Sequence, residues 1–456
     1  MKTHYYTYLV FLLLFFVGCT GHRSEFAHFD QAYYSPLGLQ NAYSFSSKMS
    51  LKDHKDGSLW ELQRGMSALM LGRYQDSIVA LDAAEAQFNH HINLFNKSLS
   101  NVGAVLVNDN VKTYVGSIYE SVLMNYYKAM DYLIIGDPND ARVEFNRAND
   151  RQRRAKEFYY KQIQKAIDKM HEKSSSRLSA QDSDSKVQEV LQEDYSNLDR
   201  FSAYSDLINP AVSYLSGLFF ALDNERAKGI DYLKEAYGIS HVITIGEDLL
   251  FFQHPSLQKF TWVFIEDGKQ ATKQEFKITL PLPLAQGMYT ASLALPQLVD
   301  GVDFHTSFSL NTTHQQNKFE ELVLLDDLIA NEFKKQLPYI ITRAITSTIL
   351  KVGLEAISNQ YLGVLGGLFS SLYAAVSTSA DIRSPSVFPR RIYTARVSNT
   401  PNERVRVLAD GQDIYNFTLL TCQASVPLSP DTFCANKHNI IYIRSFGYSS
   451  VVKVLW

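Results

Sequence analysis

Residues Asn125–Ala148, with the sequence NYYKAMDYLIIGDPNDARVEFNRA, decide the fold. Helical periodicity runs on both sides of Gly136, and small residues stand at Ala129 and Ala141. Small residues at a helix crossing let two backbones approach, and a glycine between them can take the left-handed conformation of a tight turn. Phe145 then fills the groove between the helices. The stretch therefore predicts an antiparallel helical hairpin.

The same five-position pattern recurs on either side of this stretch. A small residue is followed by a turn residue and then by small, large and small positions, at offsets of seven, five, four and three. The three sets are Gly65, Gly72, Ser77, Leu81 and Ala84; Ala129, Gly136, Ala141, Phe145 and Ala148; and Gly217, Asn224, Gly229, Leu233 and Ala236. The chain thus predicts three hairpins within a helical domain over 58–240. The open alternative is that unrelated hairpins match the pattern by chance.

The three units resemble tetratricopeptide repeats. The resemblance implies a concave surface that binds a protein partner. The units start 64 and 88 residues apart, whereas uninterrupted repeats of this type are spaced at about 34. We therefore expect extra helices or insertions between them. The polar segment 172–187 is expected to be a mobile excursion, and the charge run Asp150–Arg154 a solvated helix face.

The first 18 residues read as a secretory signal. An apolar run over 8–17 follows Lys2 and ends at Gly18 and Cys19, and it is too short to span a bilayer. This ending resembles the lipobox of bacterial lipoproteins, which implies cleavage between Gly18 and Cys19 and acylation of Cys19. The alternative is an ordinary signal peptide with a chance cysteine. Thr20, in place of an aspartate, implies by the same resemblance that the lipoprotein is sorted to the outer membrane.

The residues that follow the cleavage site, 19–57, lack clear periodicity. We expect them to form a tether between the lipid and the first domain. With Cys19 consumed by lipid, Cys422 and Cys434 remain as a pair in an oxidising compartment, which favours a disulfide. A zinc site that includes His438 is the weaker alternative, because no second pair of ligands has metal spacing.

Length and net charge limit the number of domains and the kinds of partner that we expect. The chain has 456 residues, 46% of them hydrophobic, and a formal net charge of −3. That length supports two or three domains with sizeable cores. A charge near zero gives no electrostatic footprint for nucleic acid, so no nucleic-acid partner is expected.

After Gly238 the periodicity changes from helical to strand-like. Segments 260–265 and 275–280 flank Glu266-Asp267-Gly268-Lys269 and predict a β-hairpin inside a β-rich domain over 241–318. Helix is expected again from Phe319 to Leu337, within a helical segment over 319–380. Short alternating strands predict a small C-terminal β domain over 381–456.

The segment 338–380 is strongly apolar, and 356–380 contains no charged residue. We interpret it as a buried helical hairpin because serine, asparagine and glutamine dilute its hydrophobicity. The alternative is a hairpin that enters a membrane or forms a homo-oligomer. The fold class is thus predicted as α+β, with a helical-hairpin domain followed by β-rich units that flank a hydrophobic helical hairpin.

Three stretches together resemble a proteobacterial family of uncharacterised outer-membrane lipoproteins with tetratricopeptide-like repeats. They are residues 136–149, residues 266–296 with Leu280-Pro281-Leu282 and Ala294-Leu295-Pro296, and residues 380–389. The family implies a location and an architecture, and it brings no catalytic residues.

The sequence contains no Gly-x-Ser-x-Gly elbow, no phosphate-binding glycine loop and no histidine pair at metal spacing. We therefore predict that the chain is not an enzyme and binds no cofactor or metal. The enzymatic alternative that remains open is a pair of carboxylates that cleaves glycans. The acidic pairs Glu320-Glu321 and Asp326-Asp327 are expected on the solvated side of a helix. The hypothesis is an outer-membrane lipoprotein facing the periplasm that serves as an interaction scaffold in an envelope complex. The rival hypothesis is a homo-oligomer that enters the membrane through 338–380.

Overall fold

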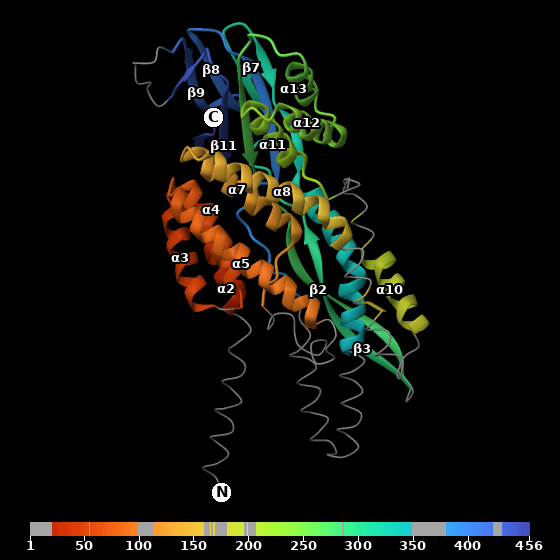
Figure 1. Ribbon diagram of the computed structural model, residues 1–456. Coiled ribbons are helices and arrows are strands. Elements are labelled where there is room, and N and C mark those ends of the chain that lie inside the picture. The colour runs from red at the N-terminus through yellow and green to blue at the C-terminus, as the bar shows by residue number, and fades with distance from the viewer. Residues whose placement is uncertain are drawn as a thin grey trace, which may run out of the picture.

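The computed structural model describes residues 21–53, 55–98, 113–158, 165, 167–168, 180–195, 198, 207–284, 287–348, 380–422 and 431–456. It is an α+β fold in which paired helices form the N-terminal region and β-sheets follow (Figure 1). The helices are α2 (Gly21–Tyr33), α3 (Leu39–Lys52), α4 (Gly57–Met70), α5 (Tyr74–Ser98), α7 (Ile118–Ile134), α8 (Pro138–Phe158), α10 (Ala180–Asp194), α11 (Pro210–Leu222), α12 (Arg226–Ser240), α13 (Ile243–Gln253) and helix 325–348.

The predicted helical hairpins are confirmed as the pairs α4–α5, α7–α8 and α11–α12. Their turn residues Gly72, Gly136 and Asn224 have φ angles of 77°, 81° and 65°. In each turn the next residue donates its backbone N–H to the carbonyl five positions earlier, over 2.8 to 2.9 Å. This is the Schellman motif, which satisfies the free carbonyls at a helix end. The three turns therefore share one local geometry.

The small and large positions of the pattern meet where the helices cross. A Cβ atom added at Gly65 would lie 2.6 Å from Cγ of Leu81, and one added at Gly217 would lie 2.9 Å from Cγ of Leu233. Real Cβ atoms do not approach other atoms so closely, so these positions require glycine while the neighbouring helix keeps its place.

The expectation of a tether over 19–57 is wrong for the described residues. Residues 21–52 form α2 and α3, and Phe29 and Tyr33 of α2 are fully buried. Phe26 stacks on Trp60 of α4 with ring centroids 4.7 Å apart. Phe26, Phe29 and Tyr33 are three and four residues apart, so they form a helical apolar stripe rather than a linker.

The expected excursion over 172–187 is also partly wrong. Residues 172–179 lie outside the described part of the chain, but 180–194 form α10. Val187 and Val190 of α10 are buried. Tyr195, which follows the helix, donates its hydroxyl to the carbonyl oxygen of Pro296 at 2.7 Å. The polar segment therefore contains an amphipathic helix, α10, which packs against the rest of the fold.

The strands form two five-stranded sheets and one two-stranded hairpin. Sheet 1 has the order β12-β11-β1-β7-β6, sheet 2 has the order β10-β9-β8-β4-β5, and β2 pairs with β3. The strands are β1 (Phe260–Asp267), β2 (Thr272–Leu284), β3 (Gly287–Val299), β4 (Phe308–Asn311), β5 (Gln316–Lys318), β6 (Glu320–Leu324), β7 (Arg391–Ser398), β8 (Glu403–Ala409), β9 (Gln412–Leu420), β10 (Thr432–Cys434), β11 (Asn439–Ser445) and β12 (Ser450–Val454).

Sheet 1 lies between the helices and sheet 2. On β1, Trp262 and Phe264 belong to the core shared with the helices, whereas Val263 and Ile265 belong to the core shared with sheet 2. The parallel neighbour β11 alternates in the same way. A strand covered on both faces reads as a continuous apolar run, which is how these two strands appear in the sequence.

Three predictions about the β region are wrong. The segments 260–265 and 275–280 form no hairpin, because β1 pairs with β7 and β11 while β2 pairs with β3. The segments 241–318 and 381–456 are not separate units, since both sheets contain strands from each. The segment expected to be helical from Phe319 begins as strand β6, and helix starts at 325.

The hydrophobic segment 338–380 is only partly described. Residues 338–348 continue helix 325–348, in which Ile341 and Ile345 are fully buried. Residues 349–379 lie outside the described part of the chain. Among the described helices, none is both long and apolar enough to cross a membrane.

Candidate interaction surface and membrane anchor

The inner helix of each hairpin is covered by the chain itself. Buried residues make up 12 of the 14 residues of α4, 14 of the 17 of α7 and 11 of the 13 of α11. Sheet 1 and the segment before β7 pack against these helices, as the contacts of Tyr127 with Glu266 and Phe388 show. The inner helices therefore leave little surface of their own for a partner.

Buried polar side chains fix the helices to the sheet. Tyr127 of α7 and Tyr442 of β11 both donate their hydroxyls to the Glu266 carboxylate of β1, at 2.9 and 2.7 Å. Arg383 pairs with Asp56, the residue before α4, at 2.6 Å, although 327 positions separate them. Since an unpaired buried charge is costly, these contacts specify one docking geometry.

A buried lysine joins the first two hairpins. Lys128 is fully buried on α7, and its Nζ lies 2.8 Å from Asp82 and 3.0 Å from Glu144, and it also contacts Glu85. Arg151 contacts the same Glu85 from α8. The prediction that 150–154 is only a solvated face is therefore wrong at Arg151.

The acidic pairs near residue 320 are not surface groups of one helix. Glu320 lies on β6 and accepts the backbone N–H groups of Ile243 and Thr244 at 3.0 and 2.9 Å, which caps α13. Asp326 is fully buried and accepts from the backbone N–H groups of Ala271 and Gly301 at 2.6 and 2.9 Å. Both carboxylates thus join segments that are distant in the chain.

Glu120 is buried in the first turn of α7. The hydroxyl of Tyr114 lies 2.7 and 2.8 Å from its two carboxylate oxygens. Burial raises the pKa of Glu120 to about 7, because the charged form loses its hydration.

A Glu120→Gln variant should be more stable than the original chain at alkaline pH. The folded carboxyl has a higher pKa than the 4.5 of the free group, so the folded state holds the proton more tightly. The protonated Glu120 carboxyl therefore makes its full contribution to the free energy of unfolding below about pH 4.5, and this contribution is lost as pH rises to about 7. Glutamine keeps an acceptor for Tyr114 and carries no charge. We expect a gain of about 3 kcal/mol at pH 8 and none at pH 4, from urea unfolding. A gain that does not depend on pH would contradict this explanation.

An exposed apolar surface lies at the end of the helical array. We define the α12–α13 patch as Tyr237, Ile243 and Leu250, whose exposed fractions are 39%, 68% and 62%. Ile243 and Leu250 are seven residues apart and share one face of α13. The ring of Tyr237 borders that face, since a Cβ added at Gly246 would lie 3.0 Å from its Cε2 atom. The opposite face of α13 buries Ile245, Asp248 and Phe252 against the fold.

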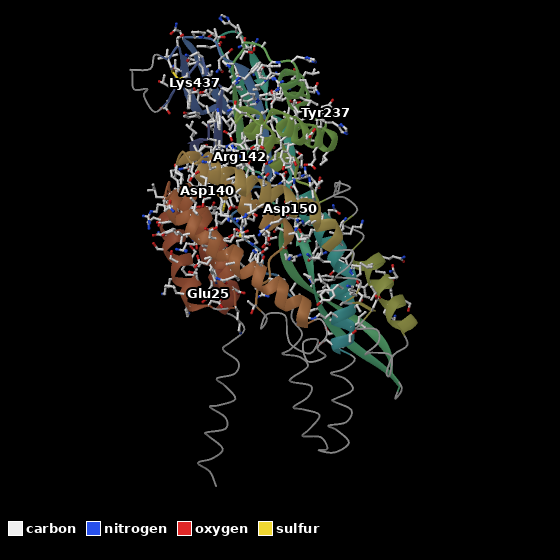
Figure 2. The ribbon with its side chains drawn as sticks, viewed as in Figure 1. Glu25, Asp140, Arg142, Asp150, Tyr237 and Lys437 are labelled. Atoms are coloured by element: carbon white, nitrogen blue, oxygen red, sulfur yellow. A yellow bond between two sulfur atoms is a disulfide. The ribbon has the colours of Figure 1, made fainter. Side chains whose placement is uncertain are left out.

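The patch and the N-terminal end of the structure lie far apart. Figure 1 places α12 and α13 in the upper part of the molecule and α2 in the lower part. Figure 2 likewise shows Tyr237 at the outer edge of α12 and Glu25 at the opposite end. No sequence pattern indicates this patch, because the exposed residues Ile243 and Leu250 and the buried residues Ile245 and Phe252 are equally apolar.

The predicted processing residues Gly18 and Cys19 lie outside the described residues, which start at 21. Helix α2 begins at Gly21, so only Thr20 separates it from Cys19. At the other end of the chain, Cys422 and Cys434 form the predicted disulfide, with Cα atoms 5.2 Å apart.

Within the described residues, no group of three or more His, Cys, Asp or Glu side chains is placed to hold a metal ion. His438, the residue considered with Cys434, instead lies among the rings of Phe251, Phe260 and Trp262. Comparisons with known protein families, with curated proteins and with solved structures find no match for this chain.

Proposed function

We propose that the chain is a lipid-anchored protein of the outer membrane, facing the periplasm, that holds a partner protein in an envelope complex. The lipobox-like Gly18-Cys19 supports the anchor, and the disulfide Cys422–Cys434 suits an oxidising compartment. The single observation that carries the binding role is the α12–α13 patch.

The patch lies where a helical array needs a cap. Stacked helical hairpins bury apolar faces against their neighbours, and the last helix of a soluble array normally has a polar outer face. Here α13 follows the third hairpin and packs on α12, but it exposes Ile243 and Leu250. We infer that a helix of the partner, with its own apolar stripe, packs there and continues the array.

Charging the patch should release the partner. A Leu250→Asp variant places a carboxylate at the centre of the proposed helix contact, so partner recovery from detergent-solubilised envelopes should fall at least about tenfold. Val79→Asp is the matched control, because Val79 is 54% exposed on α5, outside the patch. It should leave recovery unchanged.

Two outcomes would contradict the proposal. One is undiminished recovery with Leu250→Asp when circular dichroism shows a folded chain. The other is recovery of nothing but further copies of this chain with the native complex kept intact.

A further inference from the structure

The C-terminal end of α3 lies beside the start of α2. Nζ of Lys52, the last residue of α3, is 3.9 Å from Oε1 of Glu25, which comes four residues after α2 begins. Further along both helices, the rings of His28 and Phe45 lie with their centroids 4.6 Å apart, so the two helices run antiparallel. Figure 2 shows Glu25 at the lower end of these helices. The end of α3 is therefore on the side of the fold where the proposed anchor lies.

Exposed lysines lie around an exposed leucine at this end of α3. Lys48, Leu51 and Lys52 are three and four residues apart, so they share one face of the helix. Leu51 is 81% exposed, the side chain of Lys52 is 68% exposed, and Lys48 is also exposed. Lys55, just after the helix, is exposed as well. We define the α3-end surface as Lys48, Leu51, Lys52 and Lys55.

The lysine charges of this surface are available to an outside partner. Helix α3 contains no acidic residue. Asp53, which follows it, uses Oδ1 to accept the backbone N–H groups of Lys55 and Asp56, at 3.1 and 3.3 Å. Among the residues that the structure describes, Lys48 and Lys55 form no ion pair. The surface therefore presents a positive charge that the fold only partly compensates.

The charge is confined to the end of α3 that lies next to the proposed anchor. The exposed residues nearer the start of α3 are Gln40, Asn41 and Ser44, which are polar but uncharged. A face that only needs to be solvated could carry its charges anywhere along the helix. The position of the lysines therefore favours a negatively charged surface that lies beyond the end of α3.

The proposed anchor brings such a surface within reach. Only Thr20 separates Cys19 from α2, and the four residues of helix from Gly21 to Glu25 rise by about 6 Å. An anionic leaflet attracts lysines that lie within about one Debye length, roughly 8 Å at physiological salt. Lysines can place their charged ends among headgroups while an exposed leucine between them enters the boundary with the acyl chains.

We propose that the α3-end surface binds the anionic headgroups of the leaflet that holds the Cys19 lipid. This inference rests on the anchor of the proposed function. A single lipid attachment lets a fold tilt above the membrane, whereas a second contact fixes its orientation. The second contact would keep the α12–α13 patch turned away from the bilayer and open to its partner.

The test measures how fast each lysine of the full-length acylated protein is acetylated by a water-soluble reagent. The protein is reconstituted into vesicles of phosphatidylethanolamine with either anionic phosphatidylglycerol or zwitterionic phosphatidylcholine, and mass spectrometry follows each site. Lys234 is the internal control, because it lies on α12 with its side chain 55% exposed, at the opposite end of the molecule from α2.

We expect acetylation of Lys52 to be at least about tenfold slower on the anionic vesicles, because each lysine near an anionic surface favours the bound orientation by about fivefold. Lys234 should react at the same rate on both kinds of vesicle. Equal rates for Lys52 on the two, with the protein bound to both in flotation, would overturn the α3-end surface alone. Failure of the protein to float with either kind would overturn the anchor, and this proposal with it.

Two variants locate the contact. Leu51→Glu removes the apolar residue and adds a negative charge among the lysines, so the slowing at Lys52 should fall at least about fivefold. Ser44→Glu is the matched control, because it adds the same charge to the same face of α3 seven residues earlier. It should leave the slowing unchanged. Equal effects of the two variants would show that net charge rather than the α3-end surface governs binding, which would contradict the proposal.

Discussion

A Cys19→Ser variant should lose all metabolic labelling with palmitate and disappear from the outer-membrane fraction. Serine has no thiol to receive diacylglycerol, and the signal is normally cut only after that transfer. The precursor should therefore accumulate uncleaved, larger than the mature chain by the 18 residues of the signal. Fractionation of envelopes and gel mobility measure the two effects.

The other cysteines give the control for this experiment. A variant with serine at both Cys422 and Cys434 loses the disulfide and keeps the lipid attachment residue. It should remain labelled, processed and membrane-bound. If Cys19→Ser fractionates with the outer membrane as the original chain does, the anchor is wrong.

The structure changes what the anchor implies. The sequence predicts a tether after Cys19, which would let the folded part move freely above the membrane. Instead α2 begins at Gly21 and buries Phe29 and Tyr33. In the proposed function, an acylated Cys19 would thus hold the fold itself at the bilayer, with the α12–α13 patch on the distant side of the molecule.

The helical hairpins could be predicted because their determinants are local. A left-handed turn residue such as Gly136 and a small residue one helical crossing away act within a few residues of each other. The disulfide could also be predicted, since compartment and cysteine count suffice when one pair remains.

The sheet pairing could not be predicted because it is not local. The turn that suggested a hairpin exists, and Gly268 has a φ of 76°. The strand that follows this turn, β2, nevertheless pairs with β3. Strand β1 pairs instead with β11, where Ile440 lies opposite Trp262 although the two residues are far apart in the chain. Short strands that fit several neighbours are assigned by the global packing, and a local pattern gives no information about it.

Buried charges were misread for a related reason. Asp326 resembles a surface carboxylate in the sequence, and its burial depends on Arg390, whose Nε lies 2.9 Å away in space and 64 positions away in the chain. Lys128 likewise depends on acidic residues from two other helices. Such pairs are visible only when the fold brings them together.

The largest stability effect is expected at Asp248, which joins the helical array to sheet 1. Its carboxylate accepts from the Tyr214 hydroxyl of α11 at 2.5 Å and from the Trp262 indole of β1 at 2.8 Å. It also contacts the Arg396 guanidinium of β7. Burial raises the pKa of Asp248 to about 6 despite Arg396, so the ionised carboxylate by itself adds little stability at neutral pH.

Removing the carboxylate is nevertheless costly. An Asp248→Ala variant leaves the Tyr214 and Trp262 donors buried without this acceptor and deprives Arg396 of one counter-ion. We expect a loss of about 3–5 kcal/mol in the free energy of unfolding at pH 7, measured by urea denaturation.

Glu247→Ala is the matched control for Asp248→Ala. Glu247 is the preceding residue on α13 and pairs with the same Arg396 at 2.6 Å, but its side chain is 56% exposed. Water screens such a pair, so its loss should cost no more than about 1 kcal/mol. The comparison separates burial from charge, because both variants remove one carboxylate from one arginine. Equal losses in the two variants would mean that Asp248 acts only as a charge, and that the helices are held on sheet 1 by their apolar contacts.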